Sequence, residues 1–403
     1  MLLSSCHSSR FDPPERLGPP AVVTHENEPH LWLLLKQEER KKRHIGSGSR
    51  SLGNWVTEIH FHFELQCHDP RTSARLWKKR LLTVKEKEGG RNAEARILGQ
   101  DGDVVWLFLH DQPVAFAPAD GTIVANRKEI EQRNLALQGL IPKELNFYAF
   151  DNGLVITTAD ARRHKVRAAD YAAELYKPES DDHFRGVQFR ATQWNGGYRT
   201  GDFLTRQATL GGRWLGFYSE KEAADAADDG FGDTLKNPDS VFNEGSRARR
   251  SFWTARIGKT KEFTEGSHDR LFDVTRVPAA PDFLEAGFVV AQGTKQPLTL
   301  HDPEGLLVLH RTRLDAEGRL ALTRLDESLR PKWDTTLPFL ELGNRYELPD
   351  RLLFYGAVSS TEKGVTQAQE LIVATDLSDG RTQAWNVTLE RSVAAEELEK
   401  REP

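Results

Sequence analysis

The sequence predicts an all-β protein, a single β-propeller of six to seven four-stranded blades with one helical insertion. Three observations lead to this prediction: a composition rich in turn residues, a unit that recurs along the chain, and short apolar runs suited to inner strands. The 403 residues include 31 Gly and 19 Pro, which indicate many turns instead of long helices. With 20 Phe and 9 Trp, the chain can also build a sizeable core.

The recurring unit consists of an apolar strand, a tight turn with Asp or Gly, and a strand that contains Trp. It is clear in three copies, at residues 64–82, 320–337 and 372–389. Each copy has an aspartate seven to nine residues before a tryptophan. These pairs are Asp69 and Trp77, Asp326 and Trp333, and Asp376 and Trp385. We expect the turn residues to adopt positive φ angles and the aromatic residues to lie at the beginning of strands.

Fainter copies extend the repeat. One lies at 104–126 and keeps Asp120-Gly121, a second lies at 153–175, and a third runs from 212 to 257 and is split by an insertion. A single four-stranded unit cannot bury both of its faces, whereas units stacked around an axis can. Strand candidates near 31, 104, 153, 212, 306 and 352 predict six blades, and a strand at 283–293 would add a seventh.

The propeller is expected to span residues 21–392. Residues 1–20 are predicted to form a flexible N-terminal tether, and residues 393–403 a polar C-terminal tail. The apolar runs at 31–35 and 104–109 suit inner strands that are covered on both faces.

Residues 60–68, HFHFELQCH, alternate like a strand with one buried face. The apolar face consists of Phe61, Phe63, Leu65 and Cys67. The other face carries three histidines: His60, His62 and His68. Alternate histidines on a strand can share a metal ion, but no second strand supplies matching ligands. We therefore expect a solvated histidine face and no metal site.

The insertion at 219–250 breaks the β pattern. Ser219 and Glu222 have the spacing of a capping box, the following alanines favour a helix, and Gly230 can end it. We expect a short helix followed by a polar excursion. Protruding loops on a rigid scaffold often bind partners, but such a piece can also simply cover a blade edge. The sequence leaves both alternatives open.

The N-terminus contains Leu3-Ser4-Ser5-Cys6, which resembles the cleavage box of bacterial lipoproteins. The charged and apolar sequence that should precede such a box is missing. Either Met1 lies inside a longer signal peptide and Cys6 is a lipid anchor on the periplasmic side of a membrane, or the match is accidental and the protein is cytoplasmic. No run of about 18 apolar residues is present, so any membrane contact is expected only through Cys6.

Charge and motif patterns exclude several other functions. The 55 basic and 60 acidic residues are interspersed and give a net charge of −5, so we expect no nucleic-acid partner. The acidic stretches 179–183 and 228–233 lack the alternating ligands of a calcium loop. The segment 257–260, IGKT, resembles the end of a phosphate-binding loop, but Trp253 stands where its first glycine should be.

The Asp, Gly and Trp arrangement in TDLSDGRTQAWNVTL (375–389) resembles the repeats of quinoprotein-dehydrogenase-like propellers. In the enzymes of that group, a vicinal cysteine pair lies against pyrroloquinoline quinone. The present chain has two cysteines, Cys6 and Cys67, which are not adjacent. The resemblance therefore implies a non-catalytic bacterial member without a cofactor.

We thus expect a binding or scaffolding module that engages a protein partner through loops on one face, with help from the 219–250 excursion. A rigid ring would hold several loops in fixed geometry, so little ordering entropy would oppose association. The alternative is an enzyme or cofactor-binding protein that uses the central funnel for a quinone, a metal or a sugar.

Overall fold

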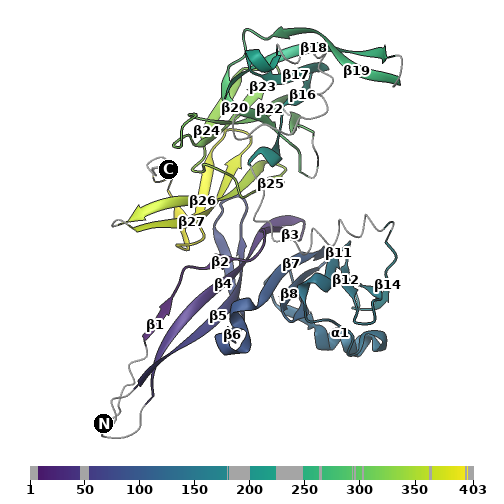
Figure 1. Ribbon diagram of the computed structural model, residues 1–403, viewed down its shortest axis with the longest axis vertical. Coiled ribbons are helices and arrows are strands. Elements are labelled where there is room, and N and C mark those ends of the chain that lie inside the picture. The colour runs from purple at the N-terminus through teal and green to yellow at the C-terminus, as the bar shows by residue number, and fades with distance from the viewer. Residues whose placement is uncertain are drawn as a thin grey trace. The chain divides into compact units, whose positions relative to one another are not determined.

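The structure is a computed structural model that describes residues 8–45, 54–178, 180, 200–223, 248–262, 266–292, 294, 296–301, 304–362, 365–394 and 397. The described chain is mostly β, as the sequence predicts, with the short α1 (Arg127–Arg133) and a few 3-10 turns. It divides into two compact units (Figure 1). Unit 1 comprises residues 1–70 and 75–196, and unit 2 comprises residues 71–74 and 197–403.

Unit 1 contains three successive antiparallel meanders of four strands. Meander 1 consists of β3 (Ala21–His25), β4 (Glu28–Ile45), β5 (Asn54–His68) and β6 (Arg75–Lys85). Meander 2 consists of β7 (Glu94–Asp101), β8 (Val104–His110), β9 (Gln112–Phe116) and β10 (Ile123–Asn126). Meander 3 consists of β11 (Tyr148–Phe150), β12 (Leu154–Thr157), β13 (Arg163–Val166) and β14 (Ala173–Leu175).

Unit 2 also contains three meanders. Meander 4 consists of β16 (Gln207–Leu210), β17 (Arg213–Tyr218), β18 (Arg249–Glu262) and β19 (Gly266–Arg276). Meander 5 consists of β20 (Phe283–Val289), β22 (Glu304–Arg311), β23 (Leu320–Asp326) and β24 (Pro331–Thr336). Meander 6 consists of β25 (Asn344–Leu348), β26 (Arg351–Glu362), β27 (Val365–Asp376) and β28 (Thr382–Asn386).

Additional short strands extend these meanders. In unit 1, β1 (Ser8–Phe11) and β2 (Glu15–Arg16) both pair with β4, so part of the predicted tether lies in strands. In unit 2 the additional strands are β15 (Leu204–Thr205), β21 (Thr299–His301) and β29 (Arg391–Val393). Meanders 4 and 5 join into one ten-stranded sheet, because the first residues of β18 also pair with β20.

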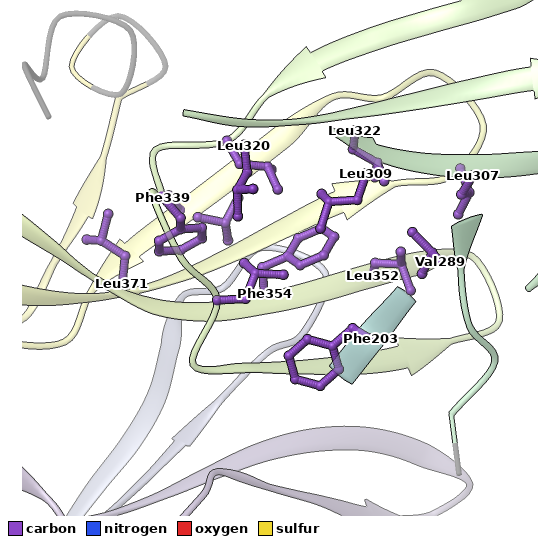
Figure 2. Packing of buried hydrophobic residues seen from close by; sticks show 14 of the residues in the cluster. Phe203, Val289, Leu307, Leu309, Leu320, Leu322, Phe339, Leu352, Phe354 and Leu371 are labelled. Atoms are coloured by element: carbon purple, nitrogen blue, oxygen red, sulfur yellow. The ribbon is translucent and has the colours of Figure 1, made fainter. Parts of the chain in front are cut away.

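Successive meanders within each unit pack face to face. In β22, Leu306 and Val308 join a core cluster with meander 4, whereas Leu307 and Leu309 join a cluster with meander 6. Figure 2 shows Leu307 and Leu309 in the second of these clusters, together with Phe354 of β26. The strand is apolar throughout because both of its faces are covered.

The same arrangement occurs in unit 1, where the apolar run of β8 is divided between two cores. Val105 and Leu107 pack with meander 1, and Trp106 and Phe108 pack with meander 3. The expectation that residues 104–109 form an inner strand covered on both faces is therefore confirmed.

The turn that precedes the fourth strand has a repeated geometry. The turns 117–122, 167–172 and 376–381 each have six residues. In each turn the amide of the first residue donates to the carbonyl of the sixth, and the amide of the fifth residue donates to the carbonyl of the first. The fifth residue has a positive φ in each turn, and only two of the three residues are glycines: Gly121, Tyr171 and Gly380. In meander 5 the turn is one residue shorter, and Leu329 takes the positive φ of 61°.

Two of the three recurring tryptophans, Trp77 and Trp333, contact the turn of the next meander. Trp333 of β24 lies against Gly380, and its Nε1 donates to the carbonyl of Leu377 at 3.3 Å. Trp77 of β6 lies against Gly121 in the same way. In both cases the tryptophan of one repeat therefore packs against the turn of the next repeat.

Candidate functional site

An open cleft of about 1140 Å³ in unit 2 is the candidate binding site. It is formed by strand ends and turns of meanders 5 and 6, at residues 291–292, 297–300, 347–350 and 376–378, with Arg324 from β23. These segments are strand ends and the connections next to them, and connections on a scaffold of strands are the usual setting for binding residues.

The apolar part of the cleft comes from leucines whose side chains also extend toward the core. Leu298 and Leu377 belong to the cluster of Figure 2, and both line the cleft. Leu348, at the end of β25, is 7% exposed and also lines it. The floor is therefore fixed by packing and does not need to be ordered when a ligand arrives.

The polar part of the cleft is held by hydrogen bonds. Arg324 donates from Nη1 to the carbonyl of Leu377 at 2.7 Å. The side chain of Gln292 accepts from the Glu347 amide at 2.9 Å, while Glu347 Oε2 accepts from the Gln292 amide at 2.8 Å. This reciprocal pair ties the β20 end of the cleft to β25.

Two aspartates of the cleft have lowered pKa values. The side-chain hydrogen bond from Arg351 lowers the pKa of Asp350, although partial burial opposes it. The hydroxyl of Ser378 lowers the pKa of Asp376 by donating to its Oδ1 at 2.6 Å. Carboxylates of this kind are good hydrogen-bond acceptors and poor proton-transfer groups at neutral pH. The cleft is thus suited to binding more than to acid–base catalysis.

The repeat residues predicted from the sequence occupy corresponding places. Asp326 and Asp376 end β23 and β27 and accept amide hydrogen bonds from the turns that follow them. Asp69 directly follows β5. The three tryptophans, Trp77, Trp333 and Trp385, lie in fourth strands. Of this whole set, Asp376 alone is found among the residues that line the cleft.

The histidine face predicted to be solvated is instead buried. Phe61, Phe63, Leu65 and Cys67 do form the apolar face toward meander 2. On the opposite face, His62 is 2% exposed and His68 is fully buried. Alternation alone could not reveal this, because His62 is contacted by Phe11 and Glu39, which are distant in the sequence. Among the described residues, no three His, Cys, Asp or Glu side chains are grouped to hold a metal ion.

The insertion begins with the capping box that the sequence predicts. The amide of Glu222 donates to Ser219 Oγ at 3.2 Å, and the Ser219 amide donates to Glu222 Oε2 at 2.8 Å. Residues 220–223 are helical, and the rest of the insertion up to residue 247 lies outside the described residues.

Two buried arginines anchor this first turn. Arg250 is fully buried and contacts Glu222 through Nε and Nη2 at 3.2 and 3.1 Å, and Arg206 Nη1 lies 3.1 Å from the same carboxylate. Burial alone would raise the pKa of Glu222, but the hydrogen bonds from Arg250 and Ser219 and the two guanidinium charges lower it to about 2. Sequence reasoning missed this cluster, because its members are far apart in the chain.

Most of the remaining predictions concern residues outside the described ranges. Cys6 lies outside the described residues, as do residues 228–233 and nearly all of 179–183. Cys67 is buried, and burial raises the pKa of its thiol to about 12. Within the described ranges, no helix is both long and apolar enough to cross a membrane.

The comparisons with known proteins give no relative. No protein-family model matches the chain, and neither a curated protein nor a solved structure is significantly similar to it.

Proposed function

We propose that the protein is a binding or scaffolding module that engages a protein partner through the loops around the unit 2 cleft. The observation that carries the proposal is the cleft itself, whose leucine floor and hydrogen-bonded rim are fixed before a ligand arrives. Preorganised loops lose little conformational entropy on association.

The lining indicates the chemistry of the partner. Glu347, Asp350 and Asp376 bring three carboxylates to the cleft, and Arg351 lies 2.7 Å from Asp350 and 3.7 Å from Asp376. Among the described residues that line the cleft, Arg324 is the only guanidinium, and it is already bonded to a backbone carbonyl. An extended segment that presents aliphatic side chains beside a lysine or arginine would match both parts of the lining. The 219–250 excursion, anchored by the Glu222 cluster, is a second candidate contact.

We further propose that the six meanders are blades of a single propeller of the quinoprotein-dehydrogenase-like kind, without a cofactor. The support is the same in both units: cores shared by successive meanders, and tryptophans that pack on the turn of the next meander.

Site-specific photocrosslinking tests the binding proposal. A photoreactive amino acid at Ser378 should give a discrete crosslinked protein in cells of the source organism, whereas one at the exposed Glu317 should not. Excess wild-type protein should compete, and Glu347→Lys protein should not. Identical crosslinked products from both positions would contradict the proposal.

The cofactor alternative has its own test. Purified protein is mixed with calcium and pyrroloquinoline quinone, and absorbance, thermal shift and dehydrogenase turnover are measured. The scaffold proposal predicts no change in any of them. Tight cofactor binding together with dehydrogenase turnover would contradict the scaffold proposal and show that the protein is an enzyme.

The cellular location is also a proposal. Lipid on Cys6 would place the protein on the periplasmic side of a bacterial membrane. Metabolic labelling with an alkyne fatty acid should then mark the wild-type protein and leave Cys6→Ser protein unmarked. Equal labelling of both, or of neither, would contradict the anchor.

A further inference from the structure

A hydroxyl, an imidazole and a carboxylate are connected across three neighbouring strands of unit 1. Thr83 of β6 lies opposite His62 of β5, and Glu39 comes from β4. Thr83 Oγ1 is 2.8 Å from His62 Nδ1, and His62 Nε2 is 2.8 Å from Glu39 Oε2. Both contacts have hydrogen-bond length, so each imidazole nitrogen has one partner.

The electrostatics favour one protonation state of this trio. Burial lowers the pKa of His62, although the hydrogen bond to Glu39 opposes the shift. Burial would raise the pKa of Glu39, but hydrogen bonds from His62, Lys41 and Ser9 outweigh it and lower the pKa overall. At neutral pH the carboxylate is therefore charged and the imidazole neutral. Nε2–H donates to Glu39, which leaves the Nδ1 lone pair to accept the proton of the Thr83 hydroxyl.

His62 and Glu39 are buried, whereas Thr83 is exposed. His62 and Glu39 are 2% and 5% exposed, and the ring of Phe11 lies 6.0 Å from the imidazole. Thr83, in contrast, is exposed at the edge of the meander. A hydroxyl that belongs to an exposed residue, and whose proton is directed to a buried base, has the arrangement of an activated nucleophile.

Two cationic residues lie on the same face of β6 as Thr83. Arg80 donates to Glu64 on the neighbouring strand, and its side chain is 48% exposed. Lys85 is two residues from Thr83 and therefore points to the same side. These charges would attract an anionic substrate and stabilise negative charge that develops near Thr83 Oγ1.

A similar trio in unit 2 differs in accessibility. His310 Nε2 lies 2.9 Å from Thr323 Oγ1 and 3.3 Å from Asp334 Oδ1. Thr323 is 1% exposed, and its hydroxyl donates to Asp334 instead of to the imidazole. The unit 2 trio is thus a buried structural network, whereas the threonine of the unit 1 trio is exposed.

We propose that Thr83 is an acyl-accepting nucleophile toward anionic esters, with His62 as its general base and Glu39 as the residue that orients the imidazole. Thr83 Oγ1 forms a bond to the ester carbonyl carbon as its proton moves to His62 Nδ1. The bond between the carbonyl carbon and the leaving oxygen then breaks, and the leaving alkoxide takes that proton. The products are an acyl-threonine and an alcohol, with no change of oxidation state. The site lies in unit 1 and is independent of the unit 2 cleft.

The experiment uses two chromogenic esters, neutral 4-nitrophenyl acetate and the anionic 4-nitrophenyl hemisuccinate. Nitrophenolate release is followed, and the acylated residue is located by peptide mass spectrometry. We expect acylation of Thr83 with a preference for the anionic ester. Thr83→Val should abolish the adduct, and His62→Gln should slow its formation by about 100-fold or more. Arg80→Gln should reduce the preference for the anionic ester.

A matched control separates reaction at Thr83 from general surface acylation. Thr57 is an exposed threonine of β5, so Thr57→Val protein should react like the wild type. Thermal unfolding of each variant confirms that the fold is retained. Adducts confined to lysines, or an unchanged rate in Thr83→Val protein, would overturn the proposal.

Discussion

The indole of Trp333 occupies the space in which a Cβ on Gly380 would lie. An ideal Cβ there would be 2.7 Å from Trp333 Cδ2, and Gly380 has a φ of 76°. The tryptophan belongs to the fourth strand of meander 5, and the glycine to the turn before the fourth strand of meander 6. The two residues that recur together in the sequence thus meet between units of the repeat.

Replacement of Gly380 by alanine should destabilise the protein through both strain and overlap. Positive φ costs a non-glycine residue about 1 kcal/mol or more, and overpacking adds about 1–3 kcal/mol. Gly211 is the matched control, because it has a φ of 56° but nothing within 4 Å of the place that a Cβ would take. Urea unfolding should show a clearly larger loss for Gly380→Ala than for Gly211→Ala. Equal losses of unfolding free energy in the two variants would mean that the contact with Trp333 does not affect stability.

The two faces of β22 should contribute alike to stability. Leu306 and Leu307 are both fully buried but belong to different cores. Truncation of either to alanine should cost about 2–5 kcal/mol in the free energy of unfolding. The 44% exposed Leu389 is the control, for which Leu389→Ala should change stability by about 0.5 kcal/mol or less. A negligible effect at one of the two β22 positions would show that one face of the strand is uncovered.

The ion pairs of Glu222 with Arg250 and Arg206 should make the free energy of unfolding depend on pH. The pKa of Glu222 falls from 4.5 to about 2 in the folded protein, so the folded state binds this proton less readily than the unfolded chain. The stabilisation is therefore complete above pH 4.5 and is lost as the pH falls toward 2. A shift of this size corresponds to about 3 kcal/mol.

Glu222→Gln protein should lack this part of the acid dependence. It should also be less stable at pH 7 by about 3 kcal/mol, because two buried arginines lose their carboxylate. Unfolding free energies measured between pH 2 and 7 provide the check. Glu220→Gln is the control, since that side chain is 82% exposed. Parallel pH profiles for wild-type and Glu222→Gln proteins would contradict the assignment.

Some of these features could be predicted from local sequence. Alternation placed Phe61 and Phe63 on one strand face, an apolar run marked β8, and the Ser219 and Glu222 spacing marked a helix start. Each depends on neighbours a few residues away, so the sequence contains the whole signal.

Other features depend on contacts that local sequence does not contain. Tyr171 and Leu329 adopt positive φ, although neither residue type favours it, because the surrounding turn and strands impose it. The burial of His62 depends on β1, and the cleft depends on segments that are about 50 residues apart. The glycines that Trp77 and Trp333 contact lie in the next repeat, which inspection of one repeat could not show.

A double-mutant cycle between Trp333 and Gly380 tests the central claim most directly, namely that the tryptophan of one meander packs on the turn of the next. Unfolding free energies are measured for the wild type, Trp333→Ala, Gly380→Ala and the double variant. We predict a coupling energy of about 1–3 kcal/mol, because removal of the indole relieves two of the three closest contacts of a Cβ at position 380, while the third, with Thr335 Oγ1, remains. Additive losses, with coupling near zero, would contradict the claim.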